Sequence, residues 1–286
     1  MKRLALLLVL VSGCGKREHV TIGAKNFTES DLLAEIVAQQ IERRTGLSVV
    51  RKLHLGGTFV CDRAIKSGDI DLYVEYTGTA FTAILKQPPI ANPDSVYRFV
   101  LAAYARDFDL RWTAPLGFNN TFAILVRRVD AERYGLRSIA DLAPVAPRWK
   151  AGFGYEFLER ADGFPGLAKA YGLRFSAPPT AMDLGLTYRA LADHRVDVIA
   201  GNSTDGQIAA LDLVALADDR GYFPPYQAAP VVRAALLAQR PAVGTALAEL
   251  GNKITDAEMR RLNAMADVEH KDIADIAREW LAARIP

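Results

Sequence analysis

A strand that runs directly into a turn of small polar residues, at positions 68–80, constrains this chain most. Residues 70–75 alternate between apolar and polar or aromatic side chains, which is the period-two pattern of a β-strand. Tyr76 and the segment 77–79 then place one ring, two hydroxyls and a glycine at the carboxyl end of that strand. Ligands of open α/β sheets bind at such ends. The residues alone equally allow a strand-end tyrosine followed by threonines that cap a helix.

The rest of the first hundred residues follows a β-α rhythm. Residues 19–24 predict a strand, and Thr28 is a candidate helix N-cap, followed by an amphipathic helix that ends at Gly46. A second strand at 47–53 and a helix that ends at Gly68 precede the strand at 70–75. This β-α-β-α-β order predicts a parallel sheet with helices on its faces, and Asp94 is expected to cap the next helix.

A second α/β region begins near residue 120. Strands are predicted at 121–126, 151–155 and 196–200, and each is followed by small or polar residues. Ser138 and Asp183 are expected to cap helices in this region. The segment 222–226 then interrupts the rhythm with two prolines, which stiffen a crossing segment, and the remainder is mainly helical.

The N-terminus has the features of a secretory signal. Lys2 and Arg3 precede a short apolar run at 4–11, which is too short to span a bilayer, since a span needs about 20 residues. Residues 11–14 resemble a bacterial lipobox, which implies a signal peptide at 1–13, cleavage before Cys14 and a lipid on its sulfur. An ordinary signal peptide with an incidental cysteine is the alternative. The expected location is extracytoplasmic, at a membrane, through the lipid anchor.

Charge and motif content exclude several functions. The formal net charge is +2, and loss of Lys2 and Arg3 leaves zero, with no basic stripe that would indicate a nucleic-acid partner. The chain has no glycine-rich phosphate loop, no Gly-x-Ser-x-Gly motif and no His or Cys cluster with metal-ligand spacing. Cys61 is expected to be a small buried residue of a helix. We therefore expect no enzyme activity, no cofactor and no metal site.

Seven short motifs in a fixed order carry a family resemblance that covers nearly all of the chain after the signal. They are residues 25–29, 56–58, 68–79, 119–123, 160–163, 203–206 and 223–226. Together they resemble the substrate-binding proteins of osmoprotectant ABC transporters of the glycine betaine, choline and carnitine type. Each motif alone is weak, and the order makes the combination specific.

The resemblance implies a two-lobed α/β fold of the type II periplasmic-binding-protein kind, in which each lobe is a mixed sheet flanked by helices. Lobe 1 would hold residues 19–119 plus 222–286, and lobe 2 would hold 120–221. The lobes would close on a small ligand like a hinge. The partners would be that ligand, an ABC permease with its ATPase, and the membrane that holds the lipid.

The resemblance also implies the ligand contacts. A quaternary ammonium has no N–H to donate, so aromatic faces must hold it by cation–π attraction. Tyr76, Phe122 and Tyr226 would form such walls, and Asn120 would shape the same end of the site. A ligand carboxylate needs cationic or hydroxyl donors, which Lys25, Thr79 and Arg160 would supply. Alternatives remain: Phe122 in the core, Arg160 paired with Asp162 or Glu156, and Lys25 solvated.

Asn202 departs from the family pattern, because relatives often carry a tyrosine there. Losing one ring weakens a cation–π site, and an amide suits a ligand that has N–H, hydroxyl or carbonyl groups. Glycine betaine, choline, carnitine or another small zwitterion all remain open as the ligand. A ligand sensor of the same fold and an enzyme on this fold are the competing interpretations.

Overall fold

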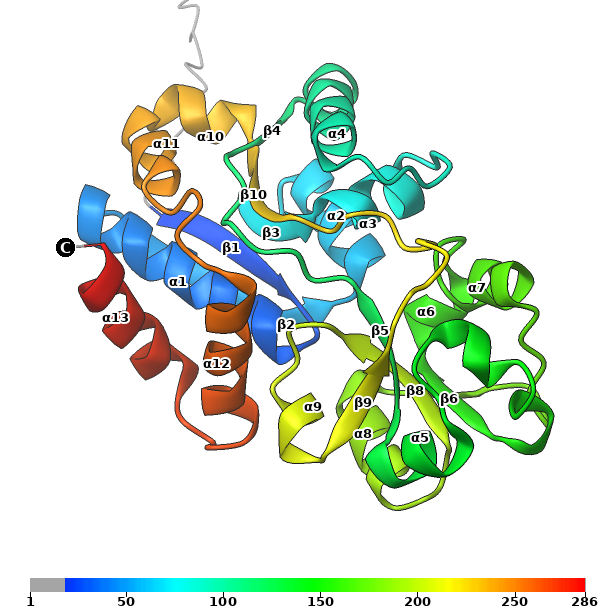
Figure 1. The fold of residues 1–286 in the computed structure, drawn as a ribbon. Helices are drawn as coiled ribbons and strands as arrows, with labels where there is room; N and C mark the ends of the chain where they lie inside the picture. Colours follow the sequence, from blue (N-terminus) through cyan, green and yellow to red (C-terminus); the bar gives the residue numbers. More distant parts are fainter. Residues whose placement is uncertain (1–18, 286) are drawn as a thin grey trace, which may run out of the picture.

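The computed structural model describes residues 19–285, so the predicted signal peptide at 1–13 and the predicted lipidation site Cys14 lie outside the described residues. The described chain forms two five-stranded sheets, each with helices packed against it (Figure 1). The elements before the first crossing are β1 (His19–Lys25), α1 (Thr28–Thr45), β2 (Ser48–Gly56), α2 (Thr58–Ser67), β3 (Leu72–Tyr76), α3 (Thr77–Thr79), a π-helical turn (Ala80–Ile84), α4 (Pro93–Asp107) and β4 (Leu110–Trp112).

The second sheet and its helices follow in the chain. They are β5 (Phe122–Arg127), α5 (Arg128–Tyr134), 3-10 turns (Ile139–Leu142 and Ala146–Arg148), β6 (Ala151–Gly154), α6 (Tyr155–Glu159), α7 (Phe164–Tyr171), β7 (Thr180–Met182), α8 (Leu184–Ala192), β8 (Val198–Asn202), α9 (Gln207–Ala210) and β9 (Leu213–Leu216). The chain then returns through β10 (Ala228–Arg233), α10 (Ala234–Gln239), α11 (Pro241–Ala248), α12 (Asp256–Asp267) and α13 (Ile273–Arg284).

The first sheet has the order β2-β1-β3-β10-β4. Its first three strands are parallel, whereas β10 runs antiparallel to both β3 and β4. Because parallel strands end at the same edge, the residues at the ends of β1, β2 and β3 meet there. Lys25, Gly56 and Tyr76 therefore lie along one edge of this sheet.

The second sheet has the order β7-β6-β8-β5-β9 and is mixed in the same way. β6 is parallel to β7 and β8, and β5 is antiparallel to β8 and β9. The register pairs Phe122, the first residue of β5, with Asn202, the last residue of β8. The predicted mixed sheets flanked by helices are thus confirmed, and Asn202 ends a strand rather than following one.

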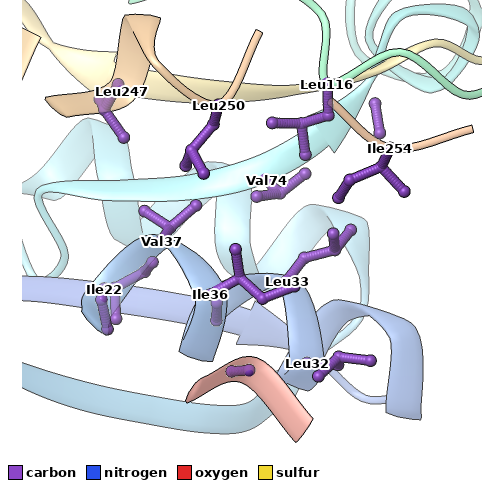
Figure 2. Packing of buried hydrophobic residues seen from close by; sticks show 14 of the residues in the cluster. Ile22, Leu32, Leu33, Ile36, Val37, Val74, Leu116, Leu247, Leu250 and Ile254 are labelled. Carbon is purple, nitrogen blue, oxygen red and sulfur yellow. The ribbon is translucent and has the colours of Figure 1, made fainter. Parts of the chain in front are cut away.

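Each sheet is buried on both faces, which explains its apolar strands. One face of the first sheet packs against α1, α11, α12 and α13 around Leu33, Ile36 and Val74 (Figure 2). Its other face packs against α2 and α4 around Ile65, Tyr73 and Tyr104. Two further clusters cover the faces of the second sheet. This packing fixes the strand ends from which the site is built.

Two segments connect the sheets, and they pair with each other. Asn119 and Gln227 form an antiparallel bridge. The backbone N–H of Asn120 donates to the carbonyl of Tyr226 at 3.0 Å, and the Tyr226 N–H donates to Asn119 Oδ1 at 2.6 Å. The outgoing and returning chains therefore form one hydrogen-bonded ribbon between the sheets.

Several local predictions differ from the structure. Phe27, not Thr28, is the N-cap of α1, and the Thr28 hydroxyl donates instead to Asp267 at 2.6 Å. Asn92 caps α4, because Pro93 takes the first helical position that suits proline, so Asp94 lies inside the first turn. The predicted caps Ser138 and Asp183 are confirmed. Within 19–285 no helix is both long and apolar enough to cross a membrane.

We predict that Gly206→Ala destabilises the contact between the second sheet's loop and α12. A β-carbon on Gly206 would lie 2.5 Å from the backbone N and Cα of Ala264, and helix backbone cannot yield as a side chain can. We expect a loss of about 1–3 kcal/mol in the free energy of unfolding, measured by urea denaturation.

Gly244→Ala is the matched control. Gly244 lies inside α11, and its added β-carbon would contact only Leu237 of α10, at an ordinary 3.5 Å. The free energy of unfolding of this variant should therefore rise by roughly 0.5–1 kcal/mol, because alanine has the higher helix propensity. Equal stability changes in the two variants would contradict the close backbone contact at Gly206.

Candidate functional site

A cavity of about 280 Å³ lies between the two sheets, at the edge where their strands end. It is large enough for a small organic molecule and is lined mainly by apolar surface with a few polar groups. All of the side chains predicted from the sequence reach its wall: Lys25, Tyr76, Thr79, Asn120, Phe122, Arg160, Asn202 and Tyr226. The structure therefore brings this set together, and its role in holding a ligand stays a prediction.

Aromatic rings dominate the wall. Phe122 and Tyr226 meet edge to face, with centroids 5.7 Å apart and planes at 77°. The sequence reasoning did not assign three further rings that line the cavity, which are Phe27, Tyr155 and Phe157. Phe27 faces Tyr76 at 6.3 Å, and Phe157 packs on Phe122 at 4.8 Å.

A signal for the three missed rings was present in the sequence. Phe27 lies in the motif at residues 25–29, just after the end of β1, and Tyr155 and Phe157 follow the end of β6. Although Asn202 stands where a tyrosine was expected, aromatic rings still form much of the cavity wall.

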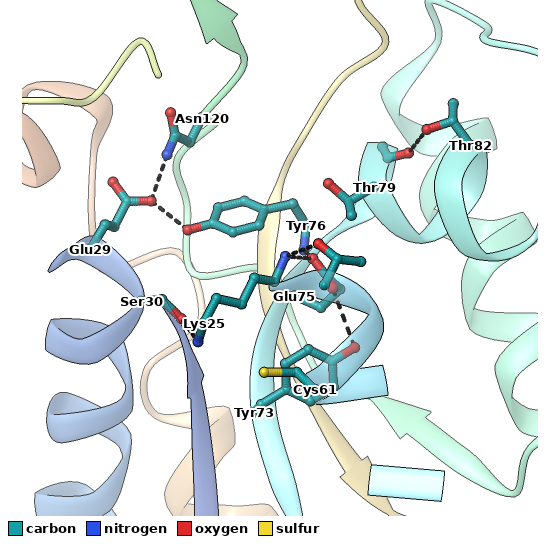
Figure 3. Close-up of polar contacts among 12 residues, drawn as sticks. Lys25, Glu29, Ser30, Cys61, Tyr73, Glu75, Tyr76, Thr79, Thr82 and Asn120 are labelled. Carbon is teal, nitrogen blue, oxygen red and sulfur yellow. Dashed lines mark hydrogen bonds and ion pairs between the residues drawn. The ribbon is translucent and has the colours of Figure 1, made fainter. Parts of the chain in front are cut away.

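Lys25 is buried and paired, rather than solvated. Its ammonium forms an ion pair with Glu75 and donates to Thr58 Oγ1 at 3.2 Å (Figure 3). It also lies 5.0 Å from the centroid of the Tyr76 ring. Because Glu75 already balances its charge, Lys25 offers a ligand anion less attraction than the sequence alone suggests.

Arg160 forms the second buried ion pair of the cavity. Its Nε and Nη2 donate to the two oxygens of Asp162 at 2.9 and 2.6 Å, a bidentate pair, and Nη2 also reaches Thr79 Oγ1 at 3.2 Å. Asp162 in turn accepts from the hydroxyls of Thr82 and Tyr226, both at 2.7 Å. Burial opposes ionisation of Asp162, but the Arg160 hydrogen bonds and charge hold its pKa below the usual range.

These contacts join the sheets across the cavity, since Arg160 and Asp162 follow α6 whereas Thr79 and Thr82 follow β3. The Nη1 of Arg160 has no hydrogen bond to any residue of 19–285. The predicted pairing of Arg160 with Asp162 and its place in the cavity wall are thus compatible.

Behind the Tyr76 ring lies Glu29, a carboxylate of the first turn of α1 that is 2% exposed. The hydroxyl of Tyr76 and the amide of Asn120 donate to its Oε1 at 2.6 and 2.8 Å (Figure 3). Burial raises the pKa of Glu29 and also that of the Tyr76 hydroxyl. Asn120 therefore reaches the cavity wall with its amide committed to Glu29.

Asn202 is held from behind by Asp205. The carboxylate accepts the Asn202 backbone N–H at 2.8 Å and the Tyr188 hydroxyl at 2.5 Å, and it lies 3.4 Å from the Asn202 amide nitrogen. Burial raises the pKa of Asp205 to about 7. With its amide nitrogen directed at Asp205, Asn202 can present its carbonyl oxygen as an acceptor to a ligand.

Two mixed sheets joined by a paired ribbon, with a ligand-sized cavity between them, define a two-lobed solute-binding protein. Residues 18–283 match the family described as the substrate binding domain of the ABC-type glycine betaine transport system. The chain belongs to this family, which confirms the resemblance. Its members are binding proteins of transporters, so the prediction of a binding protein rather than an enzyme is also confirmed.

Curated relatives support the same family. The carnitine transport binding protein OpuCC of Listeria monocytogenes is 34% identical over 94% of this chain and 88% of its own length. The ergothioneine transport permease/ergothioneine binding protein EgtU of Helicobacter pylori is 34% identical over 93% of this chain, which spans about half (48%) of that relative. Substrate-binding proteins of such importers work outside the cytoplasm.

Among solved structures, a glycine betaine/carnitine/choline ABC transporter protein is 35% identical, with a TM-score of 0.75. The match covers 92% of this chain and 98% of that one. The two-lobed fold predicted from the sequence is thus confirmed.

We predict that Asp205 makes the stability of the fold fall as the pH rises from about 4 to 7. The carboxyl of the unfolded chain has a pKa near 3.8, whereas burial raises the pKa of the folded one to about 7. The contribution of the protonated Asp205 carboxyl to the free energy of unfolding should therefore be fully present below pH 4. It should decline by up to about 1.4 kcal/mol per pH unit across this window.

Urea denaturation of wild-type and Asp205→Asn protein at several pH values measures this effect. The difference between the two free energies of unfolding should change with pH, and Asp193→Asn, at an exposed site, should show no such difference. A pH-independent difference for Asp205→Asn would contradict the prediction.

Proposed function

We propose that this chain is the extracytoplasmic ligand-binding subunit of an ABC importer that takes up a small quaternary ammonium compound of the betaine type. The observation that carries the proposal is the cavity between the lobes, which is lined by six aromatic side chains and by Arg160. Both halves of a betaine, a trimethylammonium and a carboxylate, find matching groups there.

Recognition would divide between the two ends of the ligand. Tyr76, Phe122 and Tyr226 would contact the ammonium by cation–π attraction, worth about 2 kcal/mol when desolvated. The free Nη1 of Arg160 and the Thr79 hydroxyl would hold the carboxylate by charge-assisted hydrogen bonds. Carnitine, glycine betaine and ergothioneine, named in the relatives, all combine a trimethylammonium with a carboxylate, which supports this division.

Asn202 supports an alternative within the same class. An amide oxygen in the wall suits a ligand that carries a hydroxyl or an N–H beyond the trimethylammonium, so a hydroxylated or ring-bearing zwitterion fits better than a compact one. A sensor that binds the same ligand for signalling would use the same cavity.

Closure of the lobes and delivery to a permease complete the proposal. Lobe 1 (19–119 plus 222–286) and lobe 2 (120–221) would rotate about the ribbon near Asn120 and residue 226, and the Arg160–Thr79 and Asp162–Thr82 contacts would form on closing. The permease and its ATPase would then accept the ligand from the closed protein.

We predict that residues 15–286 bind a quaternary amine with a Kd on the order of micromolar or tighter. Calorimetric titration with glycine betaine, carnitine, choline, ergothioneine and glycine tests this, and glycine, which has no methyl groups, should not bind. Asn202→Tyr should favour the compact betaine over the others. Wild-type protein that binds none of the quaternary amines would overturn the proposal.

A matched pair of variants tests the ring wall. Phe122→Leu removes a ring of the cavity wall and should weaken binding about tenfold, whereas Phe223→Leu removes a ring that packs behind Phe122 and should have a smaller effect.

Small-angle scattering of the wild-type protein should show a smaller radius of gyration with ligand than without it, and superimposable profiles would contradict hinge closure.

We also propose that the chain is a lipoprotein anchored through Cys14. Cys14→Ser should remove incorporation of radiolabelled palmitate and move the protein from the membrane fraction to the soluble one. Labelling that persists in Cys14→Ser would place the lipid elsewhere.

A further inference from the structure

Glu29 is a buried carboxylate beside the cavity that forms no ion pair with any residue of 19–285. Glu75 pairs with Lys25 and Asp162 pairs with Arg160, and no Lys, Arg or His in the described chain forms an ion pair with Glu29. Burying a carboxylate without an ion pair costs free energy, so other contacts must compensate for it or the group has a function.

The compensation consists of four neutral donors. Oε1 accepts from the Tyr76 hydroxyl and the Asn120 amide, and Oε2 accepts from the Thr204 hydroxyl and, at 2.8 Å, from the Asn263 amide. The two amide nitrogens can only donate. Burial raises the pKa of Glu29, whereas these four hydrogen bonds favour the ionised form and lower the pKa.

The position of this charge relates it directly to the cavity. Tyr76 shows its ring to the cavity while its hydroxyl donates to Glu29, so the ring separates the carboxylate from the ligand space (Figure 3). A phenol that donates to an anion gains electron density on its ring face, which strengthens the attraction for a cation.

We propose that Glu29 is a specificity-determining residue, which acts through the Tyr76 hydroxyl to make the cavity select a positively charged head group over an uncharged group of the same shape. Glu29 itself does not touch the ligand. This inference rests on the proposed function, because it assumes that a quaternary ammonium occupies the cavity.

The test compares ligands that differ only in charge. Glycine betaine is paired with 3,3-dimethylbutanoate and choline with 3,3-dimethyl-1-butanol, in which carbon replaces the ammonium nitrogen. The readout is the ratio of the two dissociation constants within a pair, by calorimetry or competition. In Glu29→Gln, which keeps the size of the side chain, the preference for the charged member should fall about tenfold.

Two controls separate charge from structure. Glu132→Gln removes an equal charge from an exposed site on α5 and should leave the ratio unchanged. Tyr76→Phe keeps the ring but removes the hydroxyl that contacts Glu29, so it should lower the ratio in the same direction. In the double variant with Glu29→Gln, the two effects should be less than additive, because both break one link.

Each outcome decides the inference. A folded Glu29→Gln protein that weakens both members of a pair equally has lost structure only, and the inference is wrong. If Glu29→Gln does not fold, Tyr76→Phe decides, and an unchanged ratio there overturns the inference. Wild-type protein that binds neither quaternary amine overturns the proposed function, and the inference falls with it, whereas wild-type binding with an unchanged ratio overturns the inference alone.

Discussion

Two buried ion pairs, Lys25–Glu75 and Arg160–Asp162, set the conditions for the rest of the site. Removing a charge from water costs several kcal/mol, and an unpaired cation beside the cavity would also repel the quaternary ammonium that we propose as ligand. Pairing solves both problems, because each cation stays close to a ring while its charge is balanced. Arg160 also donates to the Thr79 hydroxyl, and Asp162 accepts from the hydroxyls of Thr82 and Tyr226. The balance of charge and the contact between the sheets therefore depend on the same atoms.

The sequence could predict this site to the extent that strand ends predict it. Tyr76 and Lys25 end strands of one parallel set, so short local patterns locate them without knowledge of packing. Phe122 came from the family resemblance, and its pairing with Asn202 across β5 and β8 is a long-range contact that local patterns do not predict. The ordered motifs added Arg160 and Tyr226, which lie in loops where periodicity is silent. Phe157 also follows the end of a strand, but an apolar ring in the first turns of a helix equally fits a core position, and it was missed for that reason.

Glu29 shows why other residues around the cavity could not be predicted from the sequence. In the sequence it is one of two acidic residues in the first turn of a helix, a position in which an exposed carboxylate normally stabilises the helix dipole. Its burial follows from partners as far away as Asn263, 234 positions along the chain, and from the return of α12 to the first lobe. The same limit explains the wrong cap at Thr28, whose hydroxyl is taken by Asp267 of that helix, so tertiary contacts overrode a sound local preference.

The charges around the cavity also bear on which betaine it would hold. The pairs Lys25–Glu75 and Arg160–Asp162 are each balanced, and under the proposed function Arg160 would suit a zwitterion better than a cation that carries no anion. Glu29 lies behind Tyr76, so under the proposed function it would favour an orientation in which the ammonium faces that ring and the ligand carboxylate faces the opposite lobe. Under the proposed function, orientation and closure would be coupled, because Arg160 and Thr79, which would hold the ligand carboxylate together, come from different lobes. A ligand that lacks the carboxylate would fill the ring wall without drawing the lobes together.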